Sequence, residues 1–118
     1  MFVNSLYSIN STEFSPETLV AGITIDQNHS IFTGHFPGAP VTPGVVQVQI
    51  VKEIMESQLG KKLVMKSMRT CKFLEVLNPV EDPSVRINIK YKQLEMLEVT
   101  ASGESHGKVF FKMQASYL

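Results

Sequence analysis

The sequence has little of what disulfide-bonded, zinc-binding or polyanion-binding proteins are built from. Its one cysteine, Cys71, cannot form an intramolecular disulfide and lacks the CxxC or Cys/His spacing of a zinc site. The 11 lysines and arginines balance 11 aspartates and glutamates, so the net charge gives no reason to expect nucleic acid or an anionic membrane as a partner. We therefore expect Cys71 to serve in packing and the protein to bind neither partner.

Long apolar runs, cofactor motifs and internal repeats are also missing. No segment approaches the roughly 18 apolar residues of a membrane span, and the N-terminal residues lack a basic region followed by an apolar one. The seven glycines match neither GxGxxG nor a P-loop, and no cluster of metal ligands is evident. With 118 residues and no linker, the chain is expected to be a single cytoplasmic domain, residues 1–118, without cofactor or metal.

Alternation of apolar and polar residues predicts at least five antiparallel strands. Residues 84–92 show it most clearly, since Val85, Ile87 and Ile89 are separated by polar or charged residues. Similar patterning marks four further segments, which are residues 18–26, 62–76, 96–105 and 107–118. An antiparallel sheet therefore accounts for most of the chain.

Residues 45–59 are predicted to form a helix, although their valines and isoleucines favour a strand locally. The run is too long for a strand, Thr42 can cap a helix whose first residue is Pro43, and Gly60 suits its end. At about 100° per residue, one side would be polar and the other apolar. The polar side would carry Gln49, Lys52, Glu53 and Glu56, and the apolar side Val48, Val51, Met55 and Leu59. A sheet curled around this helix gives an α+β architecture.

A proline- and glycine-rich loop, residues 33–40 (TGHFPGAP), leads toward this helix. His35 is its only side chain that takes a proton near neutral pH, with a reference pKa of about 6.5. The amide of Gly44, at the helix start, has no intrahelical partner and can hold an oxyanion. A base beside such a donor suits removal of a proton next to a thioester carbonyl. On these residues alone, a purely structural His35 is the alternative.

Residues 28–49 (NHSIFTGHFPGAPVTPGVVQVQ) resemble the signature segment of the β-hydroxyacyl-(acyl-carrier-protein) dehydratases, and residues 72–91 resemble a later strand–turn–strand of that family. The matching positions are Asn28, Phe32, Gly34, His35, Phe36, Pro37, Pro40, Val41, Pro43, Gly44 and Val45. The resemblance implies the hot-dog fold, a curved antiparallel sheet of five or more strands around one long central helix. It also implies a homodimer with active sites at the interface, and reversible dehydration of 3-hydroxyacyl thioesters on acyl carrier protein.

In that family the histidine matching His35 is the general base, and the amide matching Gly44 holds the thioester carbonyl. The resemblance further makes Phe36, Pro43 and Val45 substrate-binding residues. The family's second catalytic residue is a helix carboxylate from the partner subunit, and that position is Gln49 here. An amide cannot donate a catalytic proton. Glu53, where many members carry glutamine, is the candidate auxiliary acid, although it lies one turn away, about 5.4 Å along the axis.

Three functions remain open at this point. The first is a working dehydratase in which His35 handles both protons while Gln49 only orients the hydroxyl or a water. The second is a non-catalytic or half-catalytic subunit that binds acyl carrier protein, or that completes a heterodimer whose partner supplies the carboxylate. The third is an acyl thioesterase on the same fold, against which the histidine loop argues.

The segment from residue 61 to residue 72 is basic, with no acid between Gly60 and Phe73. It is either a solvated strand face or a docking patch for the acidic acyl carrier protein. Strand alternation predicts Lys62, Lys66 and Lys72 on one face. Arg69 is expected on the other face, together with Leu63, Met65, Cys71 and Phe73.

Overall fold

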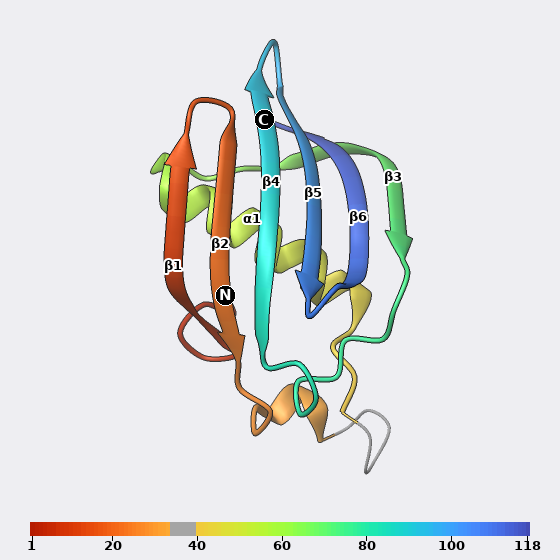
Figure 1. The fold of residues 1–118 in the computed structure, drawn as a ribbon. Coiled ribbons are helices and arrows are strands. Elements are labelled where there is room, and N and C mark those ends of the chain that lie inside the picture. The colour runs from red at the N-terminus through yellow and green to blue at the C-terminus, as the bar shows by residue number, and fades with distance from the viewer. Residues whose placement is uncertain (34–39) are drawn as a thin grey trace.

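The computed structural model describes residues 1–33 and 40–118, and in them one antiparallel sheet curves around one long helix (Figure 1). The elements in chain order are β1 (Tyr7–Ser15), β2 (Thr18–Ile25), a 3-10 helix η1 (Ser30–Phe32), α1 (Gly44–Leu59), β3 (Met65–Phe73), β4 (Ser84–Gln93), β5 (Leu97–Ser105) and β6 (Lys108–Tyr117). The six strands lie in the order β1-β2-β4-β5-β6-β3. The predicted α+β architecture is confirmed.

Strand register places the apolar residues on the face of the sheet that packs against α1. Ile87 in β4 lies opposite Ala21 in β2 and Gly103 in β5, and Ile87 and Ala21 are both buried. A side chain at position 103 would meet the ring of Phe111 at 2.5 Å, so glycine there leaves room for that ring. Period-two alternation therefore builds the core under the helix.

Strand β1 was not predicted from the sequence. Of its nine residues only Tyr7 is buried, and the strand pairs on one side only, with β2. An edge strand exposed on both faces needs no apolar alternation, so the pattern that marked the other strands is absent.

Helix α1 begins at Gly44, one residue after the predicted first position Pro43, and the expected role of Thr42 as the cap is wrong. The N-cap residue is Pro43, with φ −59° and ψ 147° and no side-chain cap, and its carbonyl accepts from the amides of Val46 and Gln47. Proline suits this extended position because its own missing N–H is not needed there. The predicted end at Gly60 is confirmed, since Gly60 takes the left-handed conformation with φ 66°.

The predicted separation of polar and apolar helix sides holds only in part. Lys52 and Glu56 are half-buried, but Glu53 is only 1% exposed. The fully buried residues of α1 are Val46, Gln47, Ile50, Val51, Glu53, Ile54 and Met55. Glu53 is inside because the N-terminal residues of the chain fold over it and supply hydrogen-bond donors.

The predicted face of Arg69 is also wrong. Strand β3 pairs with β6 through two irregularities, between Met65 and Ser67 and between Met68 and Thr70, so simple alternation fails there. The Arg69 guanidinium reaches the outer face, where it contacts Glu98 Oε1 at 2.8 Å and Ser116 Oγ at 3.0 Å.

Candidate functional site

A groove of about 350 Å³ lies at the N-terminal end of α1. It is lined by Val41, Thr42, Pro43, Gly44, Gln47 and residues 73–77. The ring of Phe73 packs directly on Gly44, where an added Cβ would lie 2.5 to 2.9 Å from three ring atoms. Only glycine allows this approach, and as the first residue of the helix Gly44 has an amide with no intrahelical partner. Val45, the predicted substrate-binding residue beside it, is 77% exposed.

Two buried polar side chains line the same groove. Gln47, only 4% exposed, donates from Nε2 to the carbonyl of Thr42 at 3.0 Å. Its Oε1 and the hydroxyl of Thr42 have no hydrogen-bond partner among the described residues. Unpaired buried polar atoms are unfavourable by about 1–3 kcal/mol each, so this end of the helix favours a polar group placed against it. No role was predicted for Gln47 from the sequence, although a glutamine inside the apolar run VVQVQIV was a usable signal.

The carboxylate of Glu53 lies inside the protein, and four groups donate to it. Phe2 N lies 3.1 and 3.0 Å from its two oxygens, and Val3 N lies 2.8 Å from Oε1. The Tyr7 hydroxyl donates to Oε1 at 3.0 Å. Gln49 Nε2 donates to Oε2 at 3.0 Å, across one helical turn. Successive backbone amides and two side chains thus form an anion-binding nest at this point.

These contacts keep Glu53 ionised. Burial by itself would raise the pKa of Glu53, but the hydrogen bonds, led by those from Phe2 N and Gln49, outweigh burial and hold the pKa below its usual value. Burial, and then the charge of Glu53, raise the pKa of Tyr7, so its hydroxyl remains a neutral donor. No sequence signal pointed to Phe2, Val3 or Tyr7, because the partners lie about fifty positions apart in the chain.

The other predicted site residues are divided between described and undescribed parts of the chain. His35 and Phe36 lie outside the described residues. Gly44 and Gln49 both lie on α1, separated by about 7.5 Å along its axis at 1.5 Å per residue. Gln49 is half-buried beside Glu53 and does not line the groove at Gly44, because five residues along the helix turn its side chain about 140° around the axis from Gly44.

The predicted docking lysines are exposed, but Arg69 is engaged elsewhere. Lys62, Lys66 and Lys72 are exposed, and Lys72 lies opposite Lys112 of β6, which adds a further positive charge. Arg69 instead pairs with Glu98, and the hydrogen bond from the Ser116 hydroxyl, followed by that from Arg69, lowers the pKa of the Glu98 carboxyl. The basic segment therefore presents its lysines to solvent, and its arginine, although 49% exposed, is paired with Glu98.

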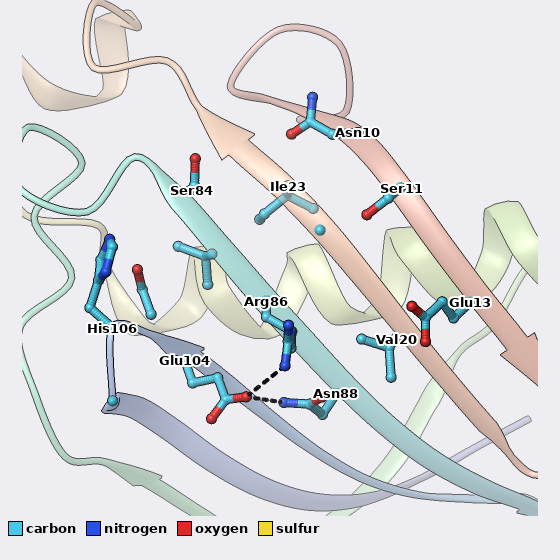
Figure 2. Close-up of a pocket in the computed structure, with 14 residues that line it drawn as sticks. Asn10, Ser11, Glu13, Val20, Ile23, Ser84, Arg86, Asn88, Glu104 and His106 are labelled. Carbon is cyan, nitrogen blue, oxygen red and sulfur yellow. Dashed lines mark hydrogen bonds and ion pairs between the residues drawn. The ribbon is translucent and has the colours of Figure 1, made fainter.

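A larger cavity, of about 640 Å³, lies on the face of the sheet turned away from α1 (Figure 2). Two of its charged side chains form a pair, since Glu104 Oε1 lies 3.9 Å from Arg86 and also accepts from Asn88 at 3.3 Å. None of the described residues assigned to catalysis or substrate binding lines this cavity. Among the described residues, the groove at the start of α1 and not the outer face of the sheet therefore holds the predicted site residues Pro43 and Gly44.

Residues 1–33 and 40–118 contain neither a metal-binding cluster nor a membrane-spanning helix. Within those ranges no three or more His, Cys, Asp or Glu side chains are grouped so as to hold a metal ion. Across the same residues, no helix has the length and apolar character needed to cross a membrane.

Comparison with known sequences identifies dehydratases as the similar proteins. The profile of the ApeI-like family, described as ApeI dehydratase, matches residues 11–113. A 3-hydroxyacyl-(acyl-carrier-protein) dehydratase FabZ of Rickettsia bellii (strain OSU 85-389) is 24% identical over 106 residues, which cover 82% of this chain and 73% of that protein. The FabZ of Lactobacillus helveticus (strain DPC 4571) is 24% identical over 114 residues, covering 90% and 77%.

Solved structures confirm the hot-dog fold expected from the sequence. The dehydratase heterocomplex ApeI:P of Xenorhabdus doucetiae aligns with a TM-score of 0.75 at 19% identity, over 92% of this chain and 95% of that one. A mutant thioesterase of Pseudomonas aeruginosa aligns with a TM-score of 0.61 at 14% identity, over 95% and 81%. At these identities the structures establish the fold alone, whereas the profile match spans most of the sequence. The chain therefore belongs to the ApeI-like dehydratase family.

Proposed function

We propose that this protein catalyses the reversible dehydration of 3-hydroxyacyl thioesters, carried on acyl carrier protein, to trans-2-enoyl thioesters. The observation that carries the proposal is the start of α1, where the Gly44 amide lies beside a groove directly after the loop that contains His35. Membership in the ApeI-like dehydratase family and the names of the FabZ relatives support the same reaction.

In the proposed reaction the chain's own groups divide the work. The Gly44 N–H holds the thioester carbonyl, and His35 takes a proton from the adjacent carbon. The bond from the next carbon to its hydroxyl breaks, and the hydroxyl leaves as water with the proton that His35 returns to it. Gln49 orients the hydroxyl without donating a proton, because an amide is not a general acid at neutral pH.

Glu53 is not the acid in this scheme. Its carboxylate is ionised, nearly fully buried and already bound by Phe2, Val3, Tyr7 and Gln49. A general acid must be protonated and reach the leaving group. These contacts favour a role for Glu53 behind Gln49, away from the substrate.

The proposed assembly is a dimer through the region around the groove. Val45, Phe73, Leu74 and Val76 are large apolar side chains that remain more than half exposed here, and β3 is an edge strand. Exposed apolar groups beside an open strand edge favour association with a second hot-dog chain. A homodimer is proposed, in which each site receives groups from both chains.

A second candidate function rests on Gln49 itself. With glutamine at the helix position, this chain could serve as the half-catalytic member of a heterodimer whose partner supplies the carboxylate. The heterodimer is supported by the fold match to a protein described as part of a dehydratase heterocomplex.

Docking of acyl carrier protein is proposed to use Lys62, Lys66 and Lys72, which are exposed and of one sign. Charges of this kind chiefly raise the association rate with an acidic partner. Arg69 contributes less, since Glu98 neutralises it.

The test is turnover of a 3-hydroxyacyl or enoyl thioester by the purified chain, alone and mixed with a hot-dog protein encoded nearby. Turnover by the chain alone, and release of no free thiol, supports the proposed dehydratase. Turnover only in the mixture selects the heterodimer. Thiol release would instead identify a thioesterase, and no turnover in any mixture would contradict both proposals.

A further inference from the structure

The contact between Gln49 and Glu53 determines which way round the Gln49 amide lies. A side-chain amide has a donor end, Nε2, and an acceptor end, Oε1, whereas an ionised carboxylate only accepts. Since Gln49 lies 3.0 Å from Glu53 Oε2, its Nε2 must face Glu53 and its Oε1 must face away. The orientation thus follows from the chemistry of the pair.

Glu53 is a rigid support for this orientation. Its carboxylate is held by Phe2 N, Val3 N and the Tyr7 hydroxyl as well as by Gln49, and its side chain is 1% exposed. Gln49 is half-buried, so part of the residue remains exposed while its amide is held by Glu53. Reversing the amide would set Oε1 against the carboxylate and remove the hydrogen bond.

We propose that Glu53 is a positioning residue that fixes Gln49 as a hydrogen-bond acceptor, and that this polarity selects thioesters with a donor at C3. The inference rests on the proposed function. The C3 hydroxyl of the substrate donates to Gln49 Oε1, which leaves the oxygen's lone pairs free to take the proton that makes it water. In the hydration direction the attacking water donates to the same oxygen.

The selectivity that follows is specific to this arrangement. A 3-oxoacyl compound carries an acceptor at C3 and would face Oε1 with no hydrogen between the two oxygens. A buried polar group left unpaired is unfavourable by about 1–3 kcal/mol, which corresponds to roughly 5- to 150-fold in affinity. The protein should therefore bind 3-hydroxyacyl ligands at least ~5-fold more tightly than matched 3-oxoacyl ligands.

The experiment compares two amide analogues, a 3-hydroxyacyl and a 3-oxoacyl pantetheine in which nitrogen replaces the thioester sulfur, by calorimetry. In Glu53→Gln, the new amide can keep its oxygen toward Phe2, Val3 and Tyr7 and turn its nitrogen toward Gln49. Gln49 then reverses and offers Nε2, so the preference for the hydroxyl compound should vanish or invert. Tyr7→Phe is the matched control, because it removes one hydrogen bond to Glu53 and leaves the carboxylate facing Gln49, so the preference should persist.

Two further measurements cover a variant that folds poorly and separate the possible failures. Gln49→Met keeps the size of the side chain and removes the acceptor, so it too should abolish the preference. In the wild type, the Gln49 side-chain amide resonances should shift in acid as Glu53 takes a proton. An unchanged preference in both Glu53→Gln and Gln49→Met, with thioester turnover retained, overturns this inference and leaves the proposed function standing. Absence of turnover and of binding by either analogue overturns both.

Discussion

Gln49→Glu places a second carboxyl group against Glu53, and its consequences can be worked out from the structure. The atoms that now form the 3.0 Å hydrogen bond would become two carboxylate oxygens. With an effective dielectric constant of about 20, Coulomb's law gives a repulsion of roughly 5 kcal/mol at that distance, an upper limit because side chains can move apart. The pair relieves the repulsion by sharing one proton, so one of its two ionisations moves up toward neutral pH.

The same change should supply the missing general acid. A carboxyl group that keeps its proton near neutral pH can donate it to the leaving hydroxyl, which typically contributes ~10²–10⁴-fold in rate. Because the raised ionisation belongs to the folded state, the folded variant binds more protons than the unfolded chain above about pH 4, and its stability falls as pH rises toward neutral. The variant should gain rate and lose stability together.

Urea unfolding and enoyl-thioester hydration, each measured from pH 5 to pH 8, test this prediction. The control is the double variant Gln49→Glu/Glu53→Gln, which keeps one carboxyl and one amide in contact. It should not show the loss of stability at higher pH, because only one carboxyl group remains in the pair. If the stability of Gln49→Glu follows that of the wild type at every pH, the two side chains are not in contact and the reasoning fails.

Three further predictions concern Glu53, Gly44 and the lysines of the basic segment. Glu53→Ala should lower the free energy of unfolding by about 3–5 kcal/mol, since it leaves buried donors unpaired, and urea titration measures it. Because the pKa of Glu53 is lowered in the folded state, its ionisation stabilises the fold above the unfolded-state pKa, near 4.3, and this contribution is lost as pH falls through the folded-state pKa. The free energy of unfolding of Glu53→Ala should therefore depend less on pH in the acid range than that of the wild type. An unchanged pH dependence would contradict the role of the carboxylate. Gly44→Ala should displace the ring of Phe73 and reduce stability by about 1–3 kcal/mol, an effect that Phe73→Ala should relieve in the double variant. Changing Lys62 and Lys66 to Glu should slow turnover of carrier-bound substrate and spare a small thioester, and equal effects on both would refute docking there.

The sequence predicted the elements whose residues carry their own signal. Five strands and the helix were recognisable because apolar periodicity reflects which face is buried, and Gly60 marked the helix end correctly. Strand β1 was not predicted because an exposed edge strand has no buried face and therefore no apolar alternation in its sequence. The predicted cap at Thr42 was wrong because cap preferences are averages over many helices, and Pro43 occupies the cap position instead.

The candidate site was predictable to the extent that it is local in sequence. Gly44 and Gln49 were identified from their spacing in the segment that resembles the dehydratases, and both lie on α1. The role of Glu53 was not predictable, because its partners Phe2 and Tyr7 reach it only through the tertiary fold. Helical periodicity alone placed Glu53 on the polar side of the helix. In the structure, long-range hydrogen bonds offset the cost of burying its charge.

The most direct test of the proposed function compares wild type with His35→Ala on a 3-hydroxyacyl thioester carried by acyl carrier protein, following formation of the enoyl product. We predict turnover by the wild type and a loss of at least ~10²-fold in the variant, with the unfolding transition unchanged, because the histidine serves chemistry. Equal turnover by the two proteins would contradict the account.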